Sequence, residues 1–119
     1  MNIAQLKQLV ITALDDIKAI DVQILDVTTM TDVTDFMVIA SGQSTRQVKA
    51  LTAEVVKQVK AAGQLPIGVE GEEVGEWALV DLGDIIVHIM TPAMRETYHL
   101  EKLWQVPAKT DDRQLTRDE

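Results

Sequence analysis

The chain has 119 residues and a mass of 13.2 kDa, which is the size of one domain with a single hydrophobic core. Its net charge of −8 argues against a dedicated nucleic-acid binder, because phosphate contacts need clustered lysine and arginine. The absence of cysteine excludes a disulfide framework and a thiolate metal site, and no segment approaches the roughly 20 apolar residues of a membrane span.

Residues 2–17 carry apolar side chains at helical spacing and predict an amphipathic helix. No basic leader precedes this helix, so we expect a cytoplasmic protein. Residues 21–27 and 35–40 follow as two predicted strands, separated by a polar, turn-like segment. The second of these runs is apolar almost throughout, which is typical of a strand buried on both faces.

A capping signal opens the second predicted helix. Ser44 and Gln47 fit a capping box, in which both side chains satisfy free N–H groups of the first turn. The helix should run to about Ala62 and stop at Gly63. Gly42 and Ser44 alternatively fit a weak phosphate cradle at the helix amino terminus, although neither GxxxxGK[ST] nor GxGxxG is present.

Two aliphatic runs flank Gly83-Asp84 and predict a tight β-hairpin, because glycine supplies the positive φ that such a turn demands. A short strand over residues 65–70 is predicted before it, in which Pro66 favours either the first residues of the strand or an edge position. One face of the hairpin is wholly aliphatic and must be core; it pairs Leu82 with Ile85, Val80 with Val87 and Ala78 with Ile89. The opposite face pairs Trp77 with Met90, Leu79 with His88 and Asp81 with Ile86.

The second face of the hairpin mixes large apolar side chains with one histidine and one carboxylate, and two interpretations stay open. A helix could cover it, with Asp81 and His88 near the rim. It could instead be half exposed and bind another protein, since Trp and Met side chains ringed by charge are typical of interface centres. The acids on and around the hairpin are Glu70, Glu72, Glu73, Glu76, Asp81 and Asp84. With no base among them, they favour a basic partner, and a solvated acidic loop without a partner fits the same residues at least as well.

Pro92 suits the first turn of a third helix, which we expect to continue from Ala93 to Trp104. Residues 107–119 are polar and aperiodic, so they predict a disordered tail after a single domain over residues 1–106. The order helix, strand, strand, helix, strand, strand, strand, helix predicts an α/β (α+β) fold, with a mixed central sheet and helices packed on it.

The charged side chains do not predict a catalytic or metal site. A two-metal nucleotidyl transferase site needs two carboxylates on one strand face, at a D-x-D spacing. Asp81 and Asp84 are separated by the predicted turn, and Asp32 and Asp35 are also three residues apart. His88 lies in mid-strand, where a core or rim histidine with one hydrogen bond is commoner than a ligand. We therefore expect no enzyme activity, no metal and no cofactor.

Five separated motifs, in order, resemble those of the Iojap-like ribosomal silencing factors. They are TDFMVIASG at 34–42, STRQ at 44–47, VEG at 69–71, WALVDLGDIIVH at 77–88 and RETYHLEKLW at 95–104. The resemblance spans roughly residues 3–104, or most of the chain. It implies a nucleotidyltransferase-like topology that lacks the catalytic carboxylates, and a protein that is not an enzyme.

The resemblance also implies a partner: large-subunit ribosomal protein fourteen, bound so that the small subunit cannot join, with translation repressed in starvation or stationary phase. It implies a homodimer when the protein is free. We expect eight residues to form the docking surface: Trp77, Leu79, Asp81, Ile86, His88, Met90, Arg95 and Tyr98. In this hypothesis Trp77 and Met90 fill apolar hollows of the partner, while Asp81 meets a basic side chain.

Two alternatives to the ribosomal role stay open. One is a nucleotide-binding or nucleotidyltransferase-like domain that uses Gly42, Ser44 and an acidic pair. The other is a dimeric adaptor for a different basic protein, which the same acidic hairpin would also suit.

Overall fold

The computed structural model describes residues 1–99, and their elements occur in the predicted order. The helices are α1 (Ile3–Asp16), α2 (Thr45–Ala61) and α3 (Pro92–Tyr98). The strands are β1 (Ile20–Asp26), β2 (Phe36–Ser41), β3 (Gly68–Glu70), β4 (Trp77–Asp81) and β5 (Ile85–Met90). The prediction of a mixed α/β fold is therefore confirmed. The predicted tail over residues 107–119 and the domain boundary at 106 lie outside the described residues.

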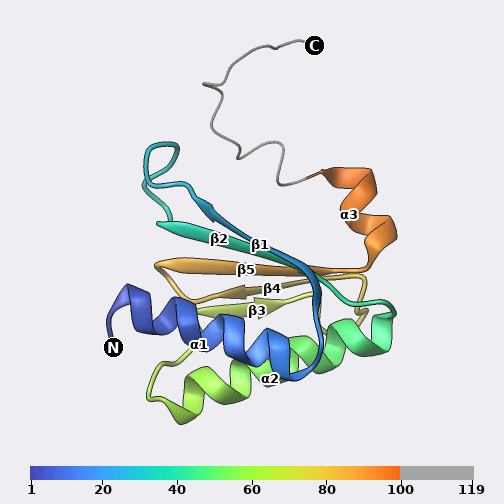
Figure 1. Ribbon diagram of the computed structural model, residues 1–119, viewed down its shortest axis with the longest axis horizontal. Helices are drawn as coiled ribbons and strands as arrows, with labels where there is room; N and C mark the ends of the chain where they lie inside the picture. Colours follow the sequence, from blue (N-terminus) through green and yellow to red (C-terminus); the bar gives the residue numbers. More distant parts are fainter. Residues whose placement is uncertain (100–119) are drawn as a thin grey trace.

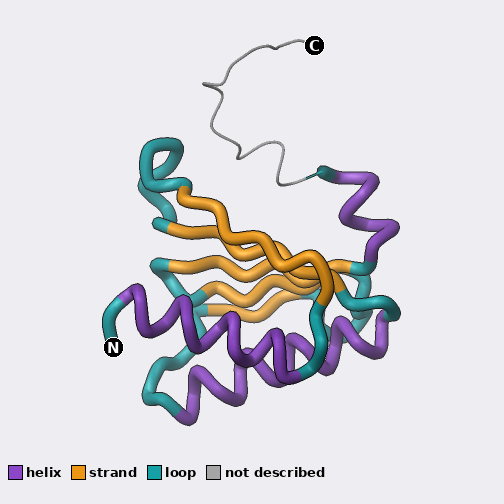
Figure 2. The backbone as a smooth tube through the Cα atoms, viewed as in Figure 1, coloured by secondary structure: helices purple, strands orange, loops and turns teal. Residues whose placement is uncertain are grey.

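The five strands form one mixed sheet in the order β1-β2-β5-β4-β3. Neighbouring strands are antiparallel except at the centre, where β2 and β5 pair in parallel. Helices α1 and α2 run together along one face of this sheet, and α3 stands at one end of the strands (Figures 1 and 2). We call the face under α1 and α2 the helix face and the opposite one the outer face.

The main core lies between the helix face and the two long helices. Each helix contributes an apolar stripe: Leu6, Val10, Ala13 and Leu14 from α1, and Val48, Leu51, Val55 and Val59 from α2. The inner strands contribute the other layer: Val38, Ala40, Ala78, Val80, Val87 and Ile89. Because burial of one aliphatic side chain contributes about 1.5–3 kcal/mol, this layer supplies most of the stability of the fold.

The hairpin of β4 and β5 has the predicted register. Trp77 lies opposite Met90, Leu79 opposite His88 and Asp81 opposite Ile86. Gly83 has a φ of +88°, and the Leu82 N–H donates to the Ile85 carbonyl at 2.9 Å across the turn. Since side chains alternate along a strand, the aliphatic set faces the helices and the mixed set lies on the outer face.

The predicted capping box at α2 is half right. The Ser44 hydroxyl accepts from the Gln47 N–H at 3.1 Å, as expected. The Gln47 side chain, however, does not return to Ser44. Its oxygen accepts from the Gln43 N–H at 2.7 Å, and its amide donates to the Ile17 carbonyl at 3.0 Å. Gln47 therefore joins the start of α2 to the end of α1 instead of closing a local box.

Two predicted elements are shorter in the structure. The edge strand begins only at Gly68, and Pro66 lies in the loop before it, where the Ile67 N–H donates to the Asp81 carbonyl at 2.8 Å. The third helix ends at Tyr98, because His99 adopts a left-handed φ of +49° as its C-cap, and the rest of its expected length, residues 100–104, lies outside the described residues. Within residues 1–99, no helix has the length and apolar character needed to cross a membrane.

Candidate docking face

The outer face of the sheet divides into a buried part and a half-exposed part. Val27, Met37, Ile39 and Met90 form a small buried cluster, against which Leu25, Trp77 and Met94 pack. Beyond this cluster, Leu79, Asp81 and Ile86 remain half exposed. α3 therefore covers one region of this face, through Met94, and leaves the other region half exposed.

Trp77 lies where the two parts meet, and two neighbours fix its ring. The indole Nε1–H donates to Nδ1 of His88 at 3.0 Å. The Tyr98 ring is centred 5.0 Å from the indole at an interplanar angle of 46°, and Tyr98 itself is 52% exposed. A ring that is already fixed loses less conformational entropy when a partner binds. Trp77 and Tyr98 together form a preorganised aromatic surface.

His88 is buried in its neutral form. Its side chain is only 7% exposed, and this burial lowers its pKa to about 4 from 6.5. Because Nδ1 accepts the indole proton, the bond requires the neutral imidazole with its own proton on Nε2. The expectation of a core or rim histidine with one hydrogen bond is confirmed, and the role of His88 is to hold Trp77 in place.

Arg95 is also buried, although we expected it among the docking residues. It is 8% exposed, and its Nη1 donates to the Ser41 hydroxyl at the end of β2, at 3.0 Å. At the start of the same helix, the Thr91 N–H donates to the Glu76 carbonyl at 3.0 Å. These bonds hold α3 across the end of the sheet, where Tyr98 reaches the indole of Trp77.

Met90 lies inside the protein, although we expected it on the docking surface. It is fully buried in the cluster with Met37 and Ile39. In this conformation it cannot fill a hollow in a partner, as the sequence suggested, and it instead supports Trp77, which lies opposite it on β4. Five of the eight expected residues are therefore at least partly open to a partner: Trp77, Leu79, Asp81, Ile86 and Tyr98.

Carboxylates surround the open part of the outer face. Asp81 accepts from the Gly83 N–H at 2.9 Å, which holds its carboxylate at the turn. Glu70 lies opposite Leu79 in the β3–β4 ladder and so shares the outer face. Glu76 is exposed immediately before β4. The sequence showed Glu70 to be near the hairpin, but only the register between β3 and β4 places it beside Leu79.

The residues considered for a phosphate cradle have structural roles in the fold. The Ser44 hydroxyl is occupied as the cap of α2. Gly42 is buried under the same helix, where an added Cβ would lie 3.0 Å from the Val48 nitrogen. Close packing of the end of β2 against α2 thus accounts for both residues. In the part of the chain that the structure describes, no three His, Asp or Glu side chains gather as metal ligands would.

Comparison with known proteins identifies the family. A family model described as "Ribosomal silencing factor during starvation" matches residues 1–119. The chain is 47% identical over 104 residues to ribosomal silencing factor RsfS of Chromobacterium violaceum, covering 87% of this chain and 85% of that protein. It is 41% identical over 99 residues to RsfS of Haemophilus influenzae, covering 83% and 97% respectively.

The fold agrees with this assignment. A crystal structure of a Chromobacterium violaceum protein, 47% identical in sequence, superposes with a TM-score of 0.86 over 90% of this chain and 91% of that one. The resemblance seen in the five sequence motifs is therefore confirmed. The chain belongs to the ribosomal silencing factor family.

Proposed function

We propose that this chain represses translation in the cytoplasm of starved or stationary cells by binding the large ribosomal subunit through large-subunit ribosomal protein fourteen. Bound there, it blocks joining of the small subunit. The observation that carries the proposal is the Trp77–Tyr98 pair, held in place on a half-exposed apolar face. The family is one of silencing factors and not of enzymes, and a steric block needs no catalytic residue.

The proposed contact has an apolar centre and an acidic rim. Trp77, Leu79 and Ile86 form the centre, and Tyr98 extends it. Asp81 at one end of β4, Glu76 just before the other end and Glu70 opposite Leu79 offer carboxylates to lysine or arginine of a basic ribosomal protein. The buried members, His88, Met90 and Arg95, act by fixing the exposed ones. The negative charge of the chain speeds its approach to a basic target and discourages contact with bare RNA.

Co-sedimentation with separated large and small ribosomal subunits tests the proposal. The wild-type chain is expected to pellet with the large subunit alone. Trp77→Ala should weaken this binding by about 2 kcal/mol or more, roughly 30-fold, because a buried aromatic anchor is lost. Asp81→Lys should also weaken it, through repulsion of the basic partner.

Two matched controls separate the face from general effects of substitution. Leu65→Ala removes an apolar side chain that is 74% exposed on the loop before β3, and Asp32→Lys reverses an exposed acid before β2. Both should bind like wild type. Because Asp81 also bonds Gly83, thermal unfolding of each variant must show an intact fold. If the wild-type chain pellets with neither subunit, the proposed ribosomal function is wrong. If both Trp77→Ala and Asp81→Lys still pellet with the large subunit, the function stands but the proposed docking face is wrong.

We also propose that a second copy of the chain covers the same face in the free protein. A homodimer is the simplest cover for a half-exposed apolar surface, because an isologous contact uses one patch twice. Analytical ultracentrifugation of the free protein is expected to show a dimer that Trp77→Ala shifts toward monomer. A dimer that is unchanged by this substitution would remove Trp77 from the self-contact.

A further inference from the structure

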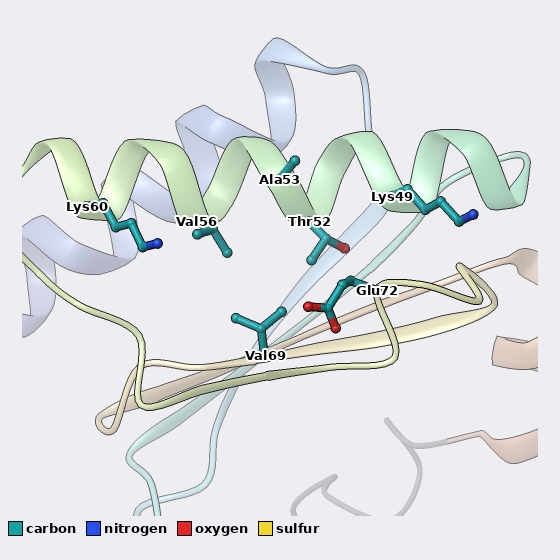
Figure 3. A pocket seen from close by; sticks show the side chains of 7 residues that line it. All are labelled: Lys49, Thr52, Ala53, Val56, Lys60, Val69 and Glu72. Carbon is teal, nitrogen blue, oxygen red and sulfur yellow. The ribbon is translucent and has the colours of Figure 1, made fainter.

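A groove on the other side of the molecule is not used by the proposed docking. It lies between α2 and β3, on the helix-face side of the sheet, and has a volume of about 340 Å³. Figure 3 shows Val56 of α2 and Val69 of β3 pointing into it from opposite walls. Lys60 lies at one end, and Lys49 and Glu72 lie at the other. The groove therefore has an apolar middle and a lysine at each end.

The end of the groove at Lys49 is already formed in the free chain. The loop between β3 and β4 packs on the first turns of α2, and Gly75 of this loop is buried there. A Cβ on Gly75 would lie 2.7 Å from the Thr45 carbonyl oxygen and 3.0 Å from two side-chain carbons of Lys49. The stem of Lys49 thus lies against the loop, which limits the movement of the ammonium group.

The exposed side of α2 is positively charged in a chain whose net charge is −8. Arg46, Lys49, Lys57 and Lys60 fall within a stripe of about 80° on the helix, at 3.6 residues per turn. The only acid of this helix, Glu54, lies outside the stripe, on the side where Gln58 donates to Asp16 of α1 at 2.9 Å. An acidic group is therefore favoured beside the groove.

The groove also runs along an open edge of the sheet. β3 is the last strand in the sheet, so the side away from β4 has no neighbouring strand among the described residues. A strand added at this edge would lie beside the basic side chains of α2, and every second side chain of the added strand would face that helix. Five extended residues place their first and fifth side chains about 13 Å apart. Lys49 and Lys60 are about 16 Å apart along the helix axis, which their long side chains can bridge.

We propose that this groove binds an extended segment of another protein, with a carboxylate at its first and fifth positions and an aliphatic side chain at its third. The two carboxylates pair with Lys49 and Lys60, and the aliphatic side chain packs between Val56 and Val69. Nucleic acid fits less well, because a continuous polyanion would meet an apolar floor between the two lysines. The site lies across the sheet from the docking face and does not depend on the proposed function.

The test is a titration of the ¹⁵N-labelled full-length chain with the peptide Gly-Ser-Glu-Thr-Val-Thr-Glu-Ser-Gly, followed by amide chemical shifts. The shifts are expected to concentrate at Val56 and along β3. The double variant Lys49→Glu/Lys60→Glu should bind the peptide at least about tenfold more weakly. Lys18→Glu, the same charge reversal at the exposed end of α1, should leave the affinity unchanged. A peptide with both glutamates replaced by lysine should not bind.

Three results would overturn the proposal. The first is the absence of shifts at the groove with the peptide at millimolar concentration. The second is equal binding by the glutamate and lysine peptides. The third is an oligouridylate that shifts the same amides more strongly than the peptide does. This result would mean that the basic side of α2 binds nucleic acid. Ribosome pelleting decides the proposed function separately, since it depends on the opposite face of the sheet.

Discussion

Gly71→Ala is expected to destabilise the fold by about 3 kcal/mol or more. Gly71 has a φ of +77°, and a Cβ there would lie 2.1 Å from the carbonyl oxygen of Trp77. Backbone cannot rotate away as a side chain can, so the loop after β3 or the start of β4 must move. Because the obstructed carbonyl belongs to Trp77, the same change should also weaken docking on the large subunit. Urea unfolding measures the first effect, and co-sedimentation measures the second.

Gly63→Ala is the matched control for this prediction. Gly63, just after α2, also has a positive φ of +92°, but no heavy atom lies within 4 Å of its added Cβ. The free energy of unfolding of Gly63→Ala should fall by only about 1 kcal/mol, from backbone strain, and the variant should bind the ribosome normally. If both variants lose the same free energy of unfolding, the prediction is wrong. Backbone strain alone would then explain both losses, and the close approach to the Trp77 carbonyl would add nothing.

Lowering the pH from about 6.5 to about 4 is expected to reduce the free energy of unfolding by about 3 kcal/mol through His88 alone. Burial holds the pKa of His88 near 4 in the folded chain, against 6.5 in the unfolded one. Between these values the unfolded chain binds a proton that the folded chain excludes. The stability that His88 contributes is therefore fully present above pH 6.5 and is lost as the pH falls.

The measurement is urea unfolding at several pH values for the wild type and for His88→Gln. The variant has no titrating group at this position, so its curve should be flatter between pH 4 and 6.5. His99→Gln removes the other histidine of the chain, which is exposed, and serves as the control. Parallel curves for wild type and His88→Gln would contradict the assignment. Protonation should also release the indole of Trp77, which tryptophan fluorescence can follow.

Features set by local chemistry could be predicted from the sequence. The Gly83-Asp84 turn fixed the register of β4 and β5, because a shift of one residue would exchange the aliphatic face with the mixed one. That register also predicted that Trp77 and Leu79 lie on the same face of the hairpin, opposite the aliphatic one. Ser44 and Gly63 likewise marked the two ends of α2.

Features that depend on distant strands could not be predicted. The parallel pairing of β2 with β5 has no local signal, yet it places Met37 and Ile39 around Met90 and Ser41 beside Arg95. The burial of Met90 and Arg95 therefore could not be predicted from the sequence. His88 differs, because the hairpin register already placed it in the next pair after Trp77–Met90 on the same face, although the hydrogen bond depends on side-chain rotation.

The parallel seam between β2 and β5 has a consequence for how the chain folds. The ladders on either side of it, β1 with β2 and β4 with β5, join neighbours along the chain and can form early. The seam instead pairs Phe36 with Ile85, across an intervening segment that includes all of α2. Closing such a long loop costs entropy before any contact is gained. The last step of folding should therefore join two partly formed halves at the centre of the sheet.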